Sequence, residues 1–186
     1  MMKKLLWFLI IICALFIVFA NIPCDGENMI YVAESSVVIN LSQDQAWKQL
    51  SNLNLAHYYV PGLIKTQITT DEQKGLGTSR RVYQSEKRYI NETVVEWQDG
   101  SGFTLKLHND DGTAPFLFSE ASFTYAIEPV SEEQVKMTNS LRYHIGMGCL
   151  GQWLHDWFLA PIIQDRIVEG ATNLKHFYET GKPANQ

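Results

Sequence analysis

The stretch ASFTYAIEPVSEEQVKMTNSLRYHI, residues 121–145, decides the fold. On both sides of a polar turn at 128–134, every second residue is apolar. This alternation is typical of strands with one buried and one exposed face. The pattern therefore predicts a long antiparallel hairpin over 116–128 and 134–145. Asn139 is the one amide that falls on its apolar face.

Other segments before this hairpin also have strand or helix patterns. Residues 30–40 are rich in β-branched residues and predict a first strand. Ser42 and Gln45 have the spacing of a capping box, which predicts a short helix over 44–52, followed by a second one over 53–59. The remaining strands are predicted over 63–70, 78–84, 89–98 and 103–108.

The C-terminal region changes period. Apolar residues recur at spacings of three and four over 151–180, which predicts one long helix that ends before Gly181. Pro161 should kink this helix or mark the start of its second half, because proline cannot donate the helical hydrogen bond. The elements together predict an α+β domain with an antiparallel sheet of about seven strands.

The turns also predict which residues oppose one another across the sheet. A three-residue turn at 99–101 and a tight turn at 85–88 set the registers of the middle strands. Arg81 is then expected opposite Glu92 on the outer face, while Val82 lies opposite Asn91 on the inner face. The other pairs expected on the inner face are Trp97 with Phe103, Val95 with Leu105, Arg80 with Thr93, Phe123 with Asn139, and Tyr125 with Met137.

The first twenty residues have the layout of a secretory signal peptide. Lys3 and Lys4 precede an unbroken apolar run at 5–20, and small residues end it. An uncleaved membrane anchor is the alternative, although sixteen residues fall short of the roughly 20 that span a bilayer comfortably. In either case we expect an exported protein, periplasmic or anchored facing outward. Residues 21–29 are expected to form a linker to a domain over 30–182.

Two cysteines, Cys24 and Cys149, remain if the chain is cut after Ala20. They could pair in an oxidising compartment, or Cys149 could be a packed thiol among its apolar neighbours. Residues 21–23 lack the small residue that lipid attachment to Cys24 would need.

Charge and histidine spacing exclude several function classes. Without Lys3 and Lys4 the chain carries 13 basic and 20 acidic residues, and the basic ones are scattered, so nucleic acid is not an expected partner. The five histidines lack metal-ligand spacing, and no phosphate loop or nucleophile elbow is present in the sequence. We expect no metal and no cofactor.

Five segments carry a resemblance to a known family: VAESSVVIN, QDQAWKQL, GLGTSRR, ETVVEWQDGSGFTLKL and GQWLHDWF. In this order they resemble the START-like or Bet v 1-like superfamily (SRPBCC), which includes the polyketide cyclase/dehydrase and lipid transport family. The resemblance covers about residues 30–180. It implies a helix-grip fold, in which a curved sheet wraps around the long helix and leaves a cavity between them.

Two polar residues stand out on the face that would line this cavity. An arginine commonly follows the glycine of this strand in the family, and Arg80 matches that position. Arg80 would bind a ligand's polar head or Asn91, or extend to solvent at the rim. Asn139 would line the cavity or be bonded within the protein. The full set of candidate ligand-binding residues is Arg80, Asn91, Val95, Phe103, Leu105, Phe123, Tyr125, Met137, Asn139, Tyr143 and Trp157.

The first interpretation is a non-catalytic exported protein that binds a small hydrophobic molecule, such as a lipid or a polyketide-like compound, between sheet and helix. One alternative is a cyclase or aromatase-type enzyme that uses tyrosine or histidine as acid and base. The other is a periplasmic accessory protein that binds a protein partner and whose cavity is largely filled. A membrane tether through residues 5–20 is compatible with all three.

Overall fold

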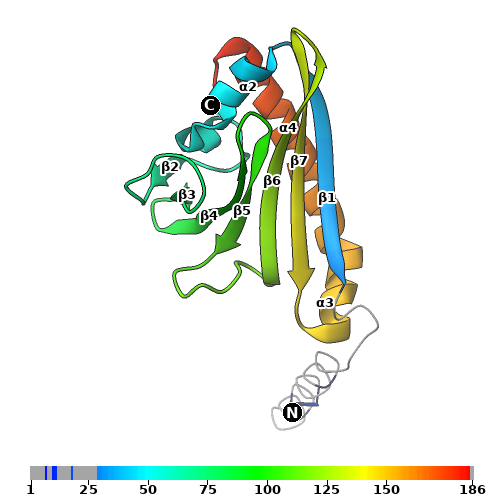
Figure 1. The fold of residues 1–186 in the computed structure, drawn as a ribbon. Helices are drawn as coiled ribbons and strands as arrows, with labels where there is room; N and C mark the ends of the chain where they lie inside the picture. The colour runs from blue at the N-terminus through cyan, green and yellow to red at the C-terminus, as the bar shows by residue number, and fades with distance from the viewer. Residues whose placement is uncertain (1–6, 8–9, 12–17, 19–28, 185–186) are drawn as a thin grey trace.

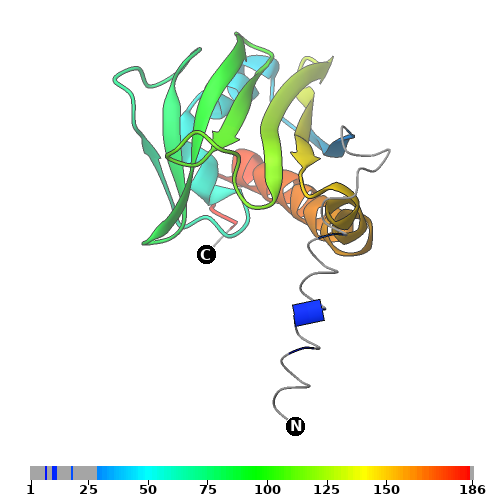
Figure 2. The ribbon, with the colours of Figure 1, turned by 90° about the horizontal axis from the view of Figure 1, so that it is seen from below.

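A computed structural model of the chain describes residues 7, 10–11, 18 and 29–184. Seven antiparallel strands form one sheet, in the order β1-β7-β6-β5-β4-β3-β2. The sheet curves around a long C-terminal helix that lies across one of its faces (Figures 1 and 2). The predicted α+β helix-grip class is therefore confirmed.

The order of elements also follows the prediction, with strand ends that differ by a few residues. The Ser42 hydroxyl accepts a hydrogen bond from the Gln45 backbone N–H, and the Gln45 side chain accepts one from the Ser42 N–H, so the capping box is present. The elements are β1 (Ile30–Ile39), α2 (Gln43–Leu50), η1 (Leu53–Tyr58), β2 (Lys65–Ile68), β3 (Ser79–Ser85), β4 (Arg88–Gln98), β5 (Gly102–His108), β6 (Phe118–Ser131), β7 (Gln134–Ile145), α3 (Gly148–Leu154), η2 (His155–Leu159) and α4 (Ala160–Thr180).

The predicted signal peptide or anchor at 1–20 and the predicted linker at 21–29 lie almost entirely outside the described residues. Cys24 also lies outside them. Cys149, at the start of α3, is disulfide-bonded. It is therefore not a packed thiol, while its pairing with Cys24 stays a prediction. Within the described part of the chain, no helix is both long and apolar enough to cross a membrane.

The register of the β6–β7 hairpin differs from the prediction by two residues. Both strands extend into the segment 128–134 that was predicted to be the turn, and their pairing ends with Ser131 opposite Gln134. As a result, Ile127 lies opposite Met137, Tyr125 opposite Asn139, and Phe123 opposite Leu141. A shift of two leaves every side chain on its predicted face, because side chains alternate with a period of two. Asn139 therefore faces inward, as expected.

Two irregularities in the middle of the sheet overturn other predicted pairs. Trp97 lies opposite Phe103 as predicted, but a bulge between Val94 and Glu96 puts Val94 opposite Leu105. Val95, predicted to face inward, is exposed. A bulge adds one residue to one strand and so reverses the faces beyond it.

A second irregularity, between Tyr83 and Ser85, shifts β3 against β4 by one residue. Arg80 lies opposite Glu92, not Thr93, and Arg81 lies opposite Asn91. Asn91 therefore belongs to the outer face, where Arg81 Nε donates a hydrogen bond to its Oδ1 at 3.1 Å. The tight turn at 85–88 is present, with Ser85 opposite Arg88, but the irregularity beyond it shifts the register by one, so the prediction that Asn91 faces inward was wrong.

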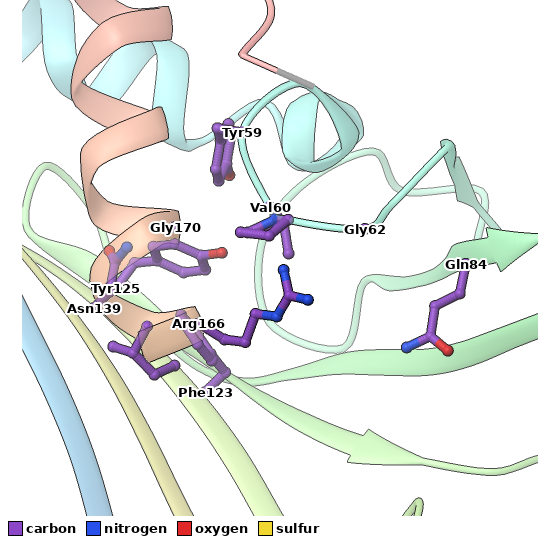
Figure 3. Close-up of a pocket in the computed structure, with 11 residues that line it drawn as sticks. Tyr59, Val60, Gly62, Gln84, Phe123, Tyr125, Asn139, Arg166 and Gly170 are labelled. Atoms are coloured by element: carbon purple, nitrogen blue, oxygen red, sulfur yellow. The ribbon is translucent and has the colours of Figure 1, made fainter. Parts of the chain in front are cut away.

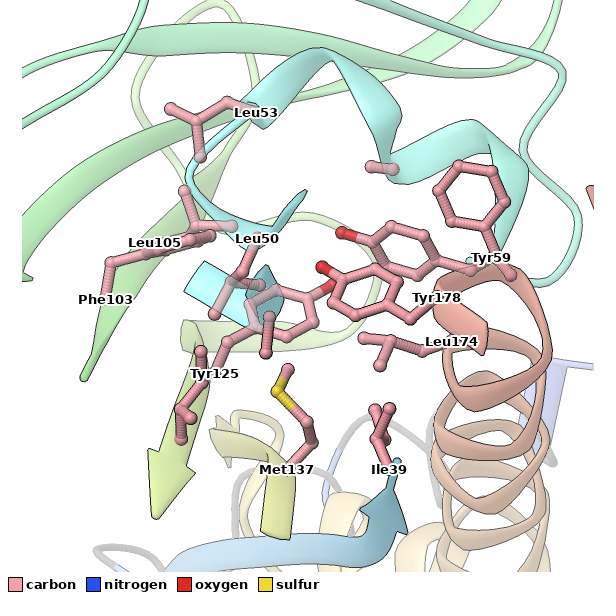
Figure 4. Close-up of a cluster of buried hydrophobic side chains, with 14 of the residues drawn as sticks. Ile39, Leu50, Leu53, Tyr59, Phe103, Leu105, Tyr125, Met137, Leu174 and Tyr178 are labelled. Carbon is pink, nitrogen blue, oxygen red and sulfur yellow. The ribbon is translucent and has the colours of Figure 1, made fainter. Parts of the chain in front are cut away.

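The main core fills most of the space between the sheet, α2, η1 and the last turns of α4 (Figure 4). Burial of a large apolar side chain stabilises the fold by roughly 1.5 to 3 kcal/mol. The largest fully buried apolar side chains are Ile39, Leu50, Leu53, Leu105, Met137, Leu174, Val94 and Val135.

The C-terminal helix is interrupted where Pro161 was expected to interrupt it. α3 and α4 are joined by the π-helical segment η2, in which the Ala160 N–H donates to the His155 carbonyl, five residues earlier. Pro161 follows in the first turn of α4, and it has no backbone N–H to donate to the preceding π turn. Pro161 thus begins the second half of the helix, and Gly181 closes it with a φ of 70°.

Candidate functional site

A cavity of about 440 Å³ lies between the concave face of the sheet, the segment after η1 and the middle of α4 (Figure 3). Its size is in the range of small-molecule sites. The residues that line it are Tyr59, Val60, Pro61, Gly62, Gln84, Phe123, Tyr125, Asn139, Arg166, Ile167 and Gly170.

Local sequence explains why this space stays open. Gly170 faces Pro61, and a Cβ at Gly170 would lie 3.5 Å from Pro61 Cδ, so a larger side chain there would enter the cavity. Gly62, with a φ of 78°, turns the chain at the rim. Arg166 lies one turn before Gly170 and is mostly exposed, so its guanidinium is at the entrance of the cavity. Its Nη1 lies 2.9 Å from Glu169 Oε2.

Asn139 contributes a buried amide to the cavity wall. Its side chain comes from the middle of β7, and the residue is only 3% exposed. Its buried Oδ1 has no hydrogen-bond partner among the described residues. A buried polar group without a partner costs about 1 to 3 kcal/mol. This amide is therefore poised to bond a polar atom of a molecule inside the cavity.

Three buried tyrosines, Tyr59, Tyr125 and Tyr178, point their hydroxyls toward one another beside the cavity (Figure 4). Burial raises the pKa of all three, well above the usual value for Tyr125 and Tyr178. The Tyr178 hydroxyl makes no hydrogen bond of standard geometry. It nevertheless lies close enough to the Tyr59 hydroxyl to lower the pKa of Tyr59 slightly against the effect of burial. All three hydroxyls are thus protonated at neutral pH and can donate hydrogen bonds.

Arg80 lies behind these tyrosines and is 2% exposed. Its Nε donates to Glu92 Oε2 at 2.6 Å and its Nη1 donates to the Leu53 carbonyl at 2.6 Å. Burial alone would lower the pKa of Arg80, but the Glu92 carboxylate beside it raises the pKa, so the guanidinium stays charged. The guanidinium in turn opposes the effect of burial on the pKa of Tyr59. Arg80 therefore supports the cavity wall from behind, and it is not a rim arginine.

The structure brings three of the predicted site residues to the cavity: Phe123, Tyr125 and Asn139. Their role in binding a ligand stays a prediction. Trp157 is 70% exposed on the surface of η2, so the prediction that it faces the sheet is wrong. Val95 is exposed, and Asn91, although buried, lies on the outer face of the sheet, so neither of them nor Trp157 lines the cavity. The others are buried but do not line the cavity: Arg80, Phe103, Leu105, Met137 and Tyr143.

Most lining residues from the segment after η1 and from α4 were missed. Gly170 and the Pro61-Gly62 pair were visible in the sequence as a small residue on the inner helix face and a chain turn. Their meeting depends on how α4 crosses the sheet, which no local pattern reports.

A second polar cluster lies at the start of the C-terminal helix. The Tyr143 hydroxyl lies 2.9 Å from His155 Nε2, and His155 Nδ1 lies 2.7 Å from Asp156. Tyr31 packs on the His155 ring with centroids 3.6 Å apart. His155 is buried here. The cluster is closed by its own contacts and fastens η2 to the sheet. In the described part of the chain, no group of three potential ligands could hold a metal ion.

Comparison with solved structures shows the same fold in proteins of low sequence identity. The crystal structure of Ara h 8.0201 is similar with a TM-score of 0.55 and 14% identity, over 78% of this chain and 97% of that one. The protein TTHA0849 from Thermus thermophilus gives 0.61 and 14%, over 80% and 97%. Norcoclaurine synthase from Thalictrum flavum, in complex with dopamine and hydroxybenzaldehyde, gives 0.54 and 15%, over 80% and 88%.

No curated protein sequence matches the chain. Its sequence does match the profile of a family described as polyketide cyclase/dehydrase and lipid transport, over residues 32–179. The match spans β1 to α4, which includes every element that builds the cavity. The structural similarities show that the fold is shared. The chain belongs to the polyketide cyclase/dehydrase and lipid transport family, within the SRPBCC superfamily.

Proposed function

We propose that this protein is an exported binding protein that holds a small hydrophobic molecule, a lipid or a polyketide-like compound, in the cavity between sheet and α4. The observation that carries the proposal is the buried Asn139 amide, unpaired at its Oδ1, in a cavity wall that is otherwise largely apolar. Apolar burial against Phe123 and Ile167 would supply the affinity. Asn139 would orient the ligand through one hydrogen bond.

The entrance and the wall together suggest an amphipathic ligand. The Asn139 oxygen requires a donor, such as a hydroxyl or amine, on the part of the ligand that lies deepest. Arg166 at the entrance favours a negative or strongly polar group at the opposite end.

Two observations support export. The apolar run at 5–20 follows Lys3 and Lys4, as in secretory signals and anchors. Cys149 is disulfide-bonded, and disulfides persist mainly in oxidising compartments.

The test is native mass spectrometry of the full chain purified from its own host, with two variants at Gly170. We expect the wild type to carry an apolar molecule and Gly170→Leu, which fills the cavity, to lose it. Gly170→Ala is the matched control, because its Cβ makes only ordinary contact with Pro61. The probe 1-anilinonaphthalene-8-sulfonate should bind the wild type and the control but not Gly170→Leu. Equal binding to all three would show that this cavity is not the site.

Acid–base catalysis in the same cavity is a second candidate function. It is favoured by the Tyr59 and Tyr125 hydroxyls, which belong to the cavity lining and keep their protons at neutral pH. Such groups can donate a proton or polarise a carbonyl, but they cannot serve as the base. If ligand binding survives Tyr125→Phe while conversion of the bound compound stops, the protein is an enzyme. Unchanged compound recovered from the wild type supports the binding protein.

A further inference from the structure

One end of the domain carries an unusual number of exposed aromatic and apolar side chains. Within α3, η2 and the first turn of α4, four large side chains are between 47% and 70% exposed: Trp153, Trp157, Phe158 and Ile162. The rings of Trp153 and Phe158 pack edge to face, with their centroids 5.5 Å apart, and form one continuous surface. Such clusters on soluble domains are typical of interaction sites. Exposed neighbours at the same end are Met29, Ile30, Phe116, Leu117 and Met147. We call these nine residues the aromatic end.

The chain enters the domain at this end. β1 begins, β7 ends and α3 lies at the same end of the sheet (Figure 1). Met29 is separated from the apolar run at 5–20 by eight residues, 21–28, which can span at most roughly 30 Å when extended. Cys149 in α3 is disulfide-bonded, and the other cysteines of the chain, Cys13 and Cys24, both precede Met29 in the sequence.

We propose that the aromatic end docks on the surface of a phospholipid bilayer, with Trp153, Trp157 and Phe158 in the interfacial layer. Tryptophan is enriched at membrane interfaces, where its ring is buried while its N–H stays near the headgroups. The chain is acidic overall, so apolar burial and not charge drives this docking, and a zwitterionic bilayer is the partner.

Helix geometry links this surface to the cavity. Ile162, Arg166 and Gly170 follow one another at intervals of four residues, so they lie along one side of α4. Ile162 belongs to the aromatic end, and Gly170 lines the cavity. Eight residues of helix span about 12 Å, so docking would hold the cavity entrance close to the headgroups. This step rests on the proposed function, whereas the docking itself does not.

The positions of the tryptophans supply an internal control for a fluorescence test. Of its five tryptophans, Trp153 and Trp157 lie at the aromatic end. Trp47 and Trp97 pack together at 5.0 Å at the opposite end, where the Gln43 amide bonds the Gly100 carbonyl of the β4–β5 turn. Replacement of the fifth, Trp7→Phe, removes any signal from the apolar run.

The experiment adds full-length Trp7→Phe protein to phosphatidylcholine vesicles with brominated acyl chains, which quench tryptophan on contact. We expect a loss of up to about half of the emission, because two of the four remaining tryptophans reach the interface. The loss should persist in high salt, since apolar contacts are not screened. Further replacement of Trp153 and Trp157 by phenylalanine should abolish it. If Trp47 and Trp97 are replaced instead, the vesicles should still quench the emission of Trp153 and Trp157.

Two results would overturn the proposal. The first is no quenching in the Trp7→Phe protein, or quenching that survives loss of Trp153 and Trp157. The second is cross-linking between copies that depends on these two residues without quenching, which would make the aromatic end a dimer interface. Ligand retention in the Gly170 series is measured without vesicles, so failure of docking and failure of the cavity proposal are distinguishable.

Discussion

Replacement of Asn139 by leucine separates a binding role from a structural one. In the ligand-free protein, the amide is almost completely buried and its Oδ1 has no partner among the described residues. Leucine has a similar length, adds apolar surface to a largely apolar wall, and removes the unpaired group. We expect Asn139→Leu to raise the free energy of unfolding by about 1 to 3 kcal/mol.

The expected gain is large enough to measure in two ways. For a chain of this size, 1 kcal/mol shifts the midpoint of thermal unfolding by about 2 to 4 °C. Urea unfolding should show a higher midpoint with an unchanged slope, since the variant exposes the same surface on unfolding. Both measurements require protein stripped of ligand, because a bound ligand stabilises the wild type and masks the difference.

The same variant should lose function while it gains stability. Without the amide, the ligand loses its deep hydrogen bond, and the ligand-induced rise in melting temperature should fall. Asn139→Asp is the matched control, because it keeps the shape but buries a carboxylate, and it should destabilise the fold. If Asn139→Leu destabilises the stripped protein by more than about 1 kcal/mol, the amide is bonded within the protein and our reasoning fails.

Three further predictions concern the surroundings of the cavity. Glu92→Leu should cost about 3 to 5 kcal/mol in urea unfolding because it leaves the buried Arg80 charge unpaired, and the double variant with Arg80→Leu should recover most of this loss. Burial raises the pKa of Tyr143 to about 12, so the folded state keeps a proton that the unfolded chain loses near pH 10, and stability should fall as pH rises from 10 to 12. Tyrosinate absorbance at high pH should therefore rise together with the loss of circular dichroism, and ionisation of buried tyrosines before unfolding would contradict this. Gly170→Ala should stabilise the helix by about 1 kcal/mol, whereas Gly151→Ala should destabilise the protein, because its Cβ would clash with the Gly146 carbonyl; thermal melts with the same sign for both would refute the packing described.

The inward face of the β6–β7 hairpin was the most predictable property of this chain. Tyr125 and Asn139 were placed inward from alternation alone, and the two-residue error in the hairpin register did not change that. Burial of one sheet face imposes a period of two, which a shift by two preserves. Element order was equally readable because caps, turns and period changes are local signals.

The middle strands show where this reasoning failed. A bulge such as the one at Val95 needs no special residue, so nothing in the sequence marked it. The one-residue shift of β3 against β4 reversed the expected faces of Asn91 and Glu92, and the partner of Arg80 was therefore missed. The cavity itself depends on the packing of side chains from segments far apart in the chain, and no local pattern reports that space.

The π turn of η2 bears on how this chain compares with its relatives. A π turn contains about one residue more than an α turn, so it rotates α3 by about 100° relative to α4. In this way His155 reaches Tyr143 while Ile167 still faces the sheet. Relatives with a continuous helix should show a one-residue gap within 155–159. Insertion or deletion of that single residue during evolution would change the direction in which the exposed rings of η2 point. The packing of α4 against the sheet would stay the same.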